Sequence, residues 1–307
     1  MRNLFKRDNR LLIGAYETER KNIAYILILP IFLITIGGIV AAPLVTITSF
    51  ISMKNLGLKL AFDLIINTGS VIVTYFLWIR LFEKRKVKYL GLSINKSSIK
   101  KYIKGFGIGL LLMLINTIII VFFCGGSISL SCKMNSNFIV TFIFIIIGWI
   151  IQGAEEEIII RGHMMPMLSK SMPVIFAIII SSSYFSILHL TNPSIGFLPI
   201  LNLFLFAFSM CIYALIEESL LGVCAIHSSW NFLQGNVFGF AVSGLDVNSY
   251  SIFKVTTKGT IFDGSKFGPE GGLIETMVIS IFIIILIFKY IKKIRGINKL
   301  KMIEVVL

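Results

Sequence analysis

Residues 155–161 place three carboxylates and one guanidinium in a stretch that is otherwise apolar enough for a membrane helix. An ionisable residue at the centre of such a helix costs about 2.5 to 3.5 kcal/mol on insertion-based scales, so it indicates function by default. Glu157 and Arg161 are four residues apart and share a helix face, which predicts an ion pair. Glu156 is turned by about 100° from Glu157, so we expect it to face a cavity. Glu155 receives no role.

Two of the three histidines also lie in apolar stretches. Phe185 precedes His189 by four residues, and Asn231 follows His227 by the same interval. Residues at this spacing lie on one helix face and can point into one cavity. Taken alone, each histidine is more typical of a satisfied core residue, and the glutamates are typical of a solvated helix end. Their joint occurrence favours a functional site.

These residue types suit hydrolysis by an activated water. A glutamate in a low-dielectric pocket can act as a general base, and histidine or an asparagine amide can donate hydrogen bonds to developing negative charge. Two histidines and one carboxylate would also suffice for a catalytic Zn2+ with an open position for water. We favour the metal-free version because Asn231 is a poor zinc ligand. No cofactor is certain, and zinc remains an alternative.

The motifs E-E-x-x-x-R (156–161), F-x-x-x-H (185–189) and H-x-x-x-N (227–231) occur in this order. In order and spacing they resemble the CPBP family, also called the CAAX prenyl protease 2 or Abi family of intramembrane endopeptidases. The resemblance implies that Glu156 and His189 activate a water that attacks a peptide carbonyl. It further implies that His227 and Asn231 stabilise the oxyanion.

The same resemblance gives supporting roles to Glu157, Arg161 and Phe185. The family has also been described as metal-dependent, with glutamate and histidine as ligands, so an intramembrane metalloprotease is the second form of the hypothesis. The expected substrate is a peptide or a membrane-proximal protein segment. Eukaryotic members cut prenylated tails, and bacterial members are linked to peptide maturation and bacteriocin self-immunity. Prenyl specificity does not follow from this chain.

Functions from other classes remain to be weighed against a protease. A non-catalytic membrane immunity or interaction protein could keep the fold and use the cavity for binding, although the intact motifs count against it. A proton-coupled transporter predicts related halves or broken helices, which the sequence lacks. The motifs H-E-x-x-H, G-x-G-D and G-x-S-G of other intramembrane proteases are absent.

The elements that must position these residues are membrane helices. With 56% hydrophobic and 14% charged residues, the composition is typical of a multi-span membrane protein. Eight stretches approach the roughly 20 residues that cross a bilayer: 23–50, 58–80, 103–123, 137–160, 173–190, 198–216, 220–240 and 273–290. We predict an all-α, polytopic bundle of about eight spans, a single membrane domain over 1–307 with a catalytic core at about 137–240.

The net charge of +14 orients the chain in the membrane. Of 29 Lys and Arg residues, 23 fall in four segments: 1–22, 80–104, 161–170 and 289–301. The positive-inside rule then predicts a multi-pass protein of the cell membrane with both termini in the cytoplasm. The same charges predict contact with anionic lipids and no binding of nucleic acid.

The remaining features are peripheral. Segment 241–272 is long enough to cap the outer end of the bundle, and a disulfide between Cys124 and Cys132 is left open. Other ionisable residues that we expect at an interface or in solvent are His163, Glu217 and Glu218.

Overall fold

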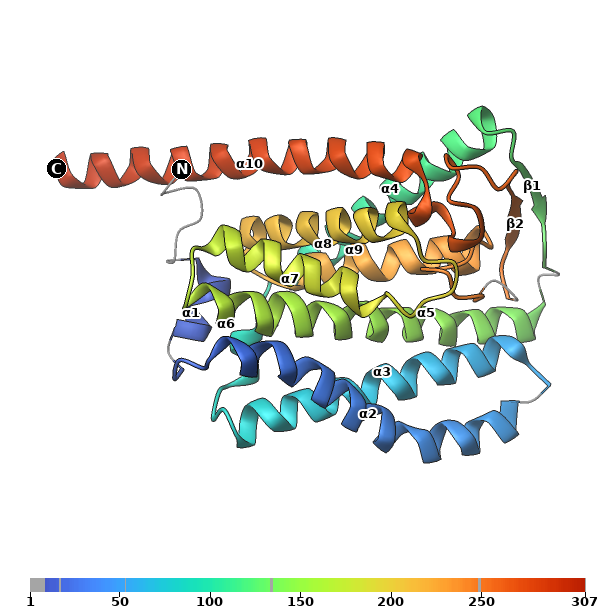
Figure 1. The fold of residues 1–307 in the computed structure, drawn as a ribbon, viewed down its shortest axis with the longest axis horizontal. Helices are drawn as coiled ribbons and strands as arrows, with labels where there is room; N and C mark the ends of the chain where they lie inside the picture. The colour runs from blue at the N-terminus through green and yellow to red at the C-terminus, as the bar shows by residue number, and fades with distance from the viewer. Residues whose placement is uncertain (1–8, 17, 53, 133–134, 248–249, 307) are drawn as a thin grey trace.

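The computed structural model describes residues 9–16, 18–52, 54–132, 135–247 and 250–306, which form a bundle of helices (Figure 1). The helices are α1 (Arg10–Tyr16), α2 (Ile23–Ser52), α3 (Leu56–Leu81), α4 (Ser98–Phe123), α5 (Ser136–Glu157), α6 (Met165–Ser169), α7 (Val174–Leu188), α8 (Phe197–Glu217), α9 (Leu221–Phe232) and α10 (Leu273–Val306). Shorter helical turns are η1 (Val87–Leu90), η2 (Ile158–Met164), η3 (Leu233–Val237), η4 (Ser265–Phe267) and η5 (Pro269–Gly271). Two strands, β1 (Ser127–Leu130) and β2 (Phe253–Thr256), pair antiparallel.

Within the described residues, six helical segments are long and apolar enough to cross a membrane. They are 23–52, 56–81, 98–123, 136–169, 197–217 and 273–294. The other two predicted spans are shorter helices: α7 has 15 residues, and α9 has 12 before it passes into the five residues of η3. The all-α polytopic bundle is therefore confirmed, with two of its eight apolar stretches too short for a full span.

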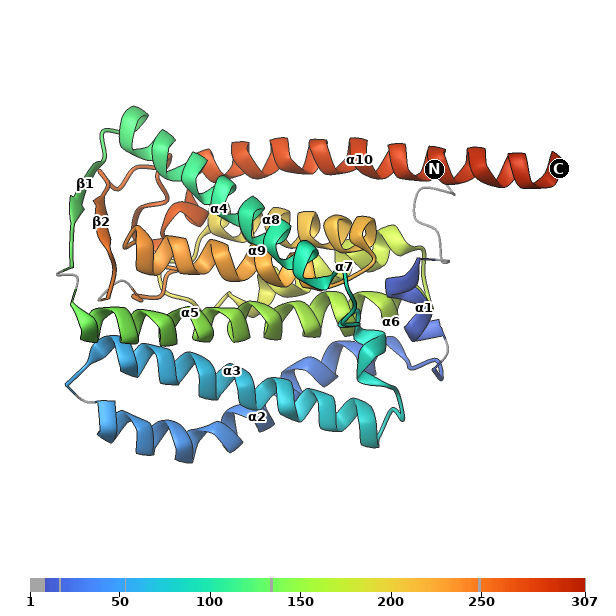
Figure 2. The same cartoon turned by 180° about the vertical axis from the view of Figure 1, so that it is seen from behind.

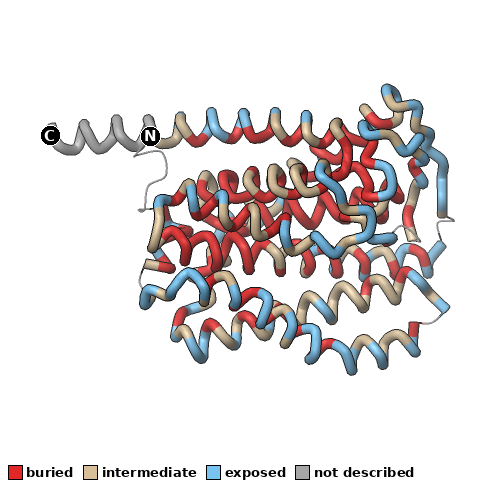
Figure 3. Tube along the Cα trace, in the orientation of Figure 1, coloured by how far each residue is buried: buried red, intermediate tan, exposed pale blue. Residues whose placement is uncertain are grey.

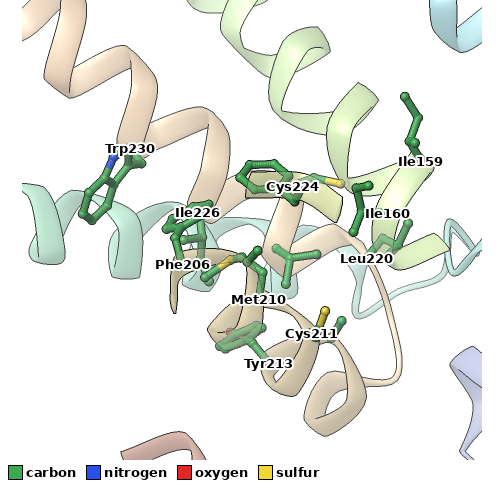
Figure 4. Packing of buried hydrophobic residues seen from close by; sticks show 14 of the residues in the cluster. Ile159, Ile160, Phe206, Met210, Cys211, Tyr213, Leu220, Cys224, Ile226 and Trp230 are labelled. Carbon is green, nitrogen blue, oxygen red and sulfur yellow. The ribbon is translucent and has the colours of Figure 1, made fainter. Parts of the chain in front are cut away.

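The burial pattern separates a lipid-facing surface from a protein core. Large apolar side chains of α2, α3, α4 and α10 are exposed, and in a membrane protein such surface suits contact with lipid tails. Figure 3 shows that the buried residues concentrate in the middle of the bundle. There α8 and α9 pack through Phe206 and Trp230, whose ring centroids are 5.6 Å apart (Figure 4).

Two glycines on one face of α4 allow it to lie directly against α9. A Cβ on Gly105 would overlap the backbone of Gly222, and a Cβ on Gly109 would overlap the Ser229 hydroxyl and the Ile226 carbonyl. Small residues four positions apart are a common means of close helix packing in membranes. This contact fixes α9, the helix that carries His227.

The β1–β2 pair lies at the end of the bundle opposite α1 and α6 (Figures 1 and 2). The described residues of the predicted cap, 241–272, lie at the β1–β2 end, and their backbone bonds to η3 and the residue after it: Ile252 N donates to Asn236 O, and Val255 N donates to Phe238 O. Cys124 and Cys132 are free thiols in this structure.

We expect Gly109→Ala to destabilise the bundle, because the new methyl group collides with α9. Overpacking of this kind costs about 1 to 3 kcal/mol. Gly107→Ala is the matched control, since a Cβ there meets no atom within 4 Å and alanine favours a helix over glycine by roughly 0.5 to 1 kcal/mol. Thermal unfolding in detergent measures both. Equal melting temperatures for the two variants would contradict the packing argument.

Candidate functional site

The polar site begins where α5 changes its winding. Glu157 is the last residue of α5, and the next seven residues, Ile158–Met164, form a π-helical segment in which each residue is buried. Such segments are rare and occur frequently at functional sites. The segment carries Arg161, so the predicted pair of Glu157 and Arg161 spans the change in winding.

The ion pair between Glu157 and Arg161 is present and fully buried. Nη1 of Arg161 donates to Oε1 of Glu157 at 3.1 Å, and both side chains are 0% exposed. The guanidinium also lies over the ring of Phe185, 4.9 Å from its centroid. The pair therefore joins η2 to α7.

His227 lies between the two predicted glutamates. Its Nδ1 is 2.9 Å from Oε1 of Glu157, and its Nε2 is 3.5 Å from Oε2 of Glu156. A carboxylate accepts, so Nδ1 carries a proton and donates to Glu157. The second ring nitrogen then faces Glu156. Phe206 packs edge-on against the imidazole, with ring centroids 5.3 Å apart.

A chain of amides connects Glu156 to Asn231. Nδ2 of Asn231 donates to Oε1 of Gln152 at 2.8 Å, and Nε2 of Gln152 donates to Oε1 of Glu156 at 2.8 Å. Gln152 was not among the predicted site residues, although its position four residues before Glu156 was a usable signal. Glu156 is the more open of the two motif glutamates, with its side chain 25% exposed.

His189 follows α7 directly and faces the same space. Its Nδ1 lies 2.9 Å from the carbonyl oxygen of Phe185. Because a carbonyl can only accept, Nδ1 carries the proton in neutral His189, and Nε2 keeps its lone pair. The rings of Phe185 and His189 are in contact, with centroids 4.7 Å apart.

Two adjoining cavities, of about 250 and 290 Å3, connect these groups. Glu156 and His189 line both cavities, whereas His227 and Asn231 line the first. The residues common to both are Glu155, Glu156, Phe185, His189, Asn192 and Leu245. The structure thus brings all four predicted catalytic residues to one continuous space.

Residues 138–233 match the model of the type II CAAX prenyl endopeptidase Rce1-like family. The matched segment runs from α5 to the start of η3 and contains all three motifs. The match covers 96 of the 307 residues, and we call this segment the Rce1-like region. The match confirms the resemblance to the CPBP family that the motifs indicated. Among curated proteins, no sequence matches the chain.

The Rce1-like region does not contain every residue at the site. Glu270 of η5 lines the first cavity and accepts hydrogen bonds from Trp230 Nε1 at 3.3 Å and from the backbone N and hydroxyl of Ser243 at 2.6 and 2.9 Å. Within the region, Glu155 is a further residue of the site: it is buried and lines both cavities. Glu270 and Ser243 could not be found from helix periodicity, because neither lies in a long helix.

Three residues that we expected at an interface or in solvent have defined partners in the structure. His163 is fully buried, with Nε2 donating to Glu83 at 2.9 Å. Burial by itself would raise the pKa of Glu83, but hydrogen bonds from His163 and Tyr25 hold it below its usual value. Glu217 accepts from the backbone N of Gly222, and Glu218 pairs with Lys293, so neither is simply solvated.

The fit of a metal ion can be judged from the donor groups. Within the described residues, no three His, Cys, Asp or Glu side chains form a group that could hold a metal ion. One nitrogen of His227 is engaged by Glu157, which leaves its Nε2 and Glu156 as neighbouring donors. This arrangement does not fit a three-ligand zinc site, so we derive no step through a metal.

We expect Arg161→Met to destabilise the protein strongly, because it leaves Glu157 buried without its cation. Breaking a buried pair in this way costs about 3 to 5 kcal/mol. Lys59→Met is the control, since Lys59 and Asp63 form a partly exposed pair at 2.8 Å worth about 0 to 1 kcal/mol. Unfolding of the purified variants distinguishes them. A loss no larger for Arg161→Met than for Lys59→Met would contradict this role.

Proposed function

We propose that the protein is an intramembrane endopeptidase that hydrolyses a peptide bond with a water activated by Glu156 and His189. The observation that carries the proposal is the convergence of Glu156, His189, His227 and Asn231 on one cavity within the Rce1-like region. These four residues come from three different helices. If they were unrelated core residues, nothing would require their two imidazoles, carboxylate and amide to line the same cavity.

The proposed base is Glu156. Its carboxylate takes a proton from water while the water oxygen attacks the peptide carbonyl, and the same proton then passes to the nitrogen as the C–N bond breaks. His189 presents the lone pair of Nε2 to the cavity and helps to orient the water. Gln152 donates to one oxygen of Glu156, which fixes the carboxylate and leaves the other oxygen for the water.

His227 and Asn231 are the proposed groups that stabilise the oxyanion. Glu157 accepts a hydrogen bond from Nδ1 of His227, so the ring donates to developing negative charge only when Nε2 is protonated as well, as an imidazolium between Glu157 and Glu156. The amide of Asn231 lies on the same helix face and is oriented by Gln152. Donors that are fixed before the reaction stabilise the transition state without reorganisation. The proposed substrate is therefore a peptide or a membrane-proximal protein segment.

We expect Glu156→Gln to lower cleavage of a quenched peptide library by about 10² to 10⁴-fold, as for loss of a general base. Cleavage by the wild type should persist in the presence of a strong chelator. Metal content is measured on the same detergent-purified samples. Chelator-sensitive cleavage with stoichiometric zinc would replace this mechanism by the metal-dependent one. Absence of cleavage in wild type would favour the non-catalytic immunity or interaction protein.

We further propose a multi-pass location in the cell membrane with both termini in the cytoplasm. The end of the bundle that holds α1 and α6 also receives the basic segment 80–104, while β1 and β2 mark the opposite end (Figure 2). Basic residues next to membrane helices favour the cytoplasmic side and bind anionic lipid at its surface.

This orientation predicts which introduced thiols an impermeant maleimide reaches. In a background with serine at Cys124 and Cys132, Lys254→Cys should be labelled in intact cells. Lys96→Cys should be labelled only after permeabilisation. Both positions are exposed, so access to the side chain does not differ between them. The reverse pattern would invert the proposed topology.

A further inference from the structure

The turn Val242–Leu245 forms a wall of the first cavity, and its Leu245 also lines the second. The turn lies outside the segment that matches the Rce1-like family. Val242 and Leu245 exchange two backbone hydrogen bonds, of 3.0 and 2.8 Å. The two central residues, Ser243 and Gly244, have φ of 48° and 81°. Positive φ at both central positions is typical of a tight hairpin turn and is strained for serine.

Contacts from several elements hold this turn in place. Asn192, three residues after His189, donates to the carbonyl of Ser243 at 2.8 Å. Glu270 accepts from the backbone and hydroxyl of Ser243 and also from Trp230, the neighbour of Asn231. A strained turn persists only when its surroundings determine it. The wall is therefore rigidly placed relative to both His189 and Asn231.

Leu245 stands where the two cavities meet. It lines both, and the residue is 50% exposed although it is large and apolar. Val242, Val247 and Leu203 line the first cavity together with Leu245, so the space that holds Glu156 also has an apolar part. A substrate whose carbonyl lies near Glu156 would place an adjacent side chain against Leu245.

We propose that Leu245, fixed by the Glu270–Ser243 contacts, determines which substrate side chain is accepted next to the scissile bond. The wall selects an apolar side chain by size. Acidic side chains are rejected, because the carboxylates of Glu156 and Glu270 line the same space and like charges repel. This inference rests on the proposed peptidase function and adds to it the residue that sets specificity.

The test compares cleavage of a peptide library in which the residue next to the scissile bond varies from alanine to phenylalanine. We expect Leu245→Ala to shift the ratio of kcat/KM for large over small residues by about 10-fold or more, the effect of one or two methylene groups in an apolar pocket. Leu245→Met keeps the volume and should keep the preference. Ile261→Ala is the matched control, since Ile261 is an exposed apolar residue of the same segment that lines neither cavity.

The Glu270–Ser243 contacts, which we call the clamp, can be tested separately. Glu270→Gln should flatten the preference for residue size, because a weaker clamp lets the wall move, and it should affect KM more than kcat. Thermal unfolding confirms that each variant is folded. An unchanged size preference in folded Leu245→Ala would overturn the inference while the wild type still cleaves. Absence of cleavage by the wild type would instead overturn the proposed function, and this inference with it.

Discussion

The buried carboxylate of Glu157 is the interaction on which the site depends. One oxygen accepts from both Arg161 and His227, so a single atom joins η2 to α9. The guanidinium of Arg161 covers the ring of Phe185 and so reaches α7, the helix that ends beside His189. A charge buried without partners would be costly by several kcal/mol. The contacts of Glu157 with Arg161 and His227, and of Arg161 with Phe185, therefore favour the arrangement in which the three motif-bearing segments lie together.

That arrangement requires the helices to approach closely. A Cβ on Gly153 of α5 would lie 2.6 Å from the hydroxyl and 2.7 Å from the backbone nitrogen of Ser228, so the backbones of α5 and α9 touch. Gly105 and Gly109 bring α4 against the other side of α9. The backbone around His227 is thus packed closely against two helices, in addition to its polar contacts. Close packing and the charged network support each other, since neither geometry exists without the other.

The sequence predicted relations within one helix and missed those that depend on how helices face each other. Spacing of four residues correctly paired Glu157 with Arg161. It did not show that His227 rather than His189 would be the imidazole nearest Glu156, because local periodicity carries no information on the relative rotation of two helices. Glu270 was missed for another reason: it lies in a segment without periodic structure.

The short helices explain how a site in a membrane receives water. The 15 residues of α7 span roughly 22 Å, less than the hydrocarbon core of about 30 Å. Helix α7 therefore ends before it could complete a span, and residues 238–247 are not helical after the short α9 and η3. Such backbone is tolerated only where protein covers it or where it lines a water-filled space. Asn192 and Glu270 satisfy these loops, and the cavity beside them is where water can meet Glu156.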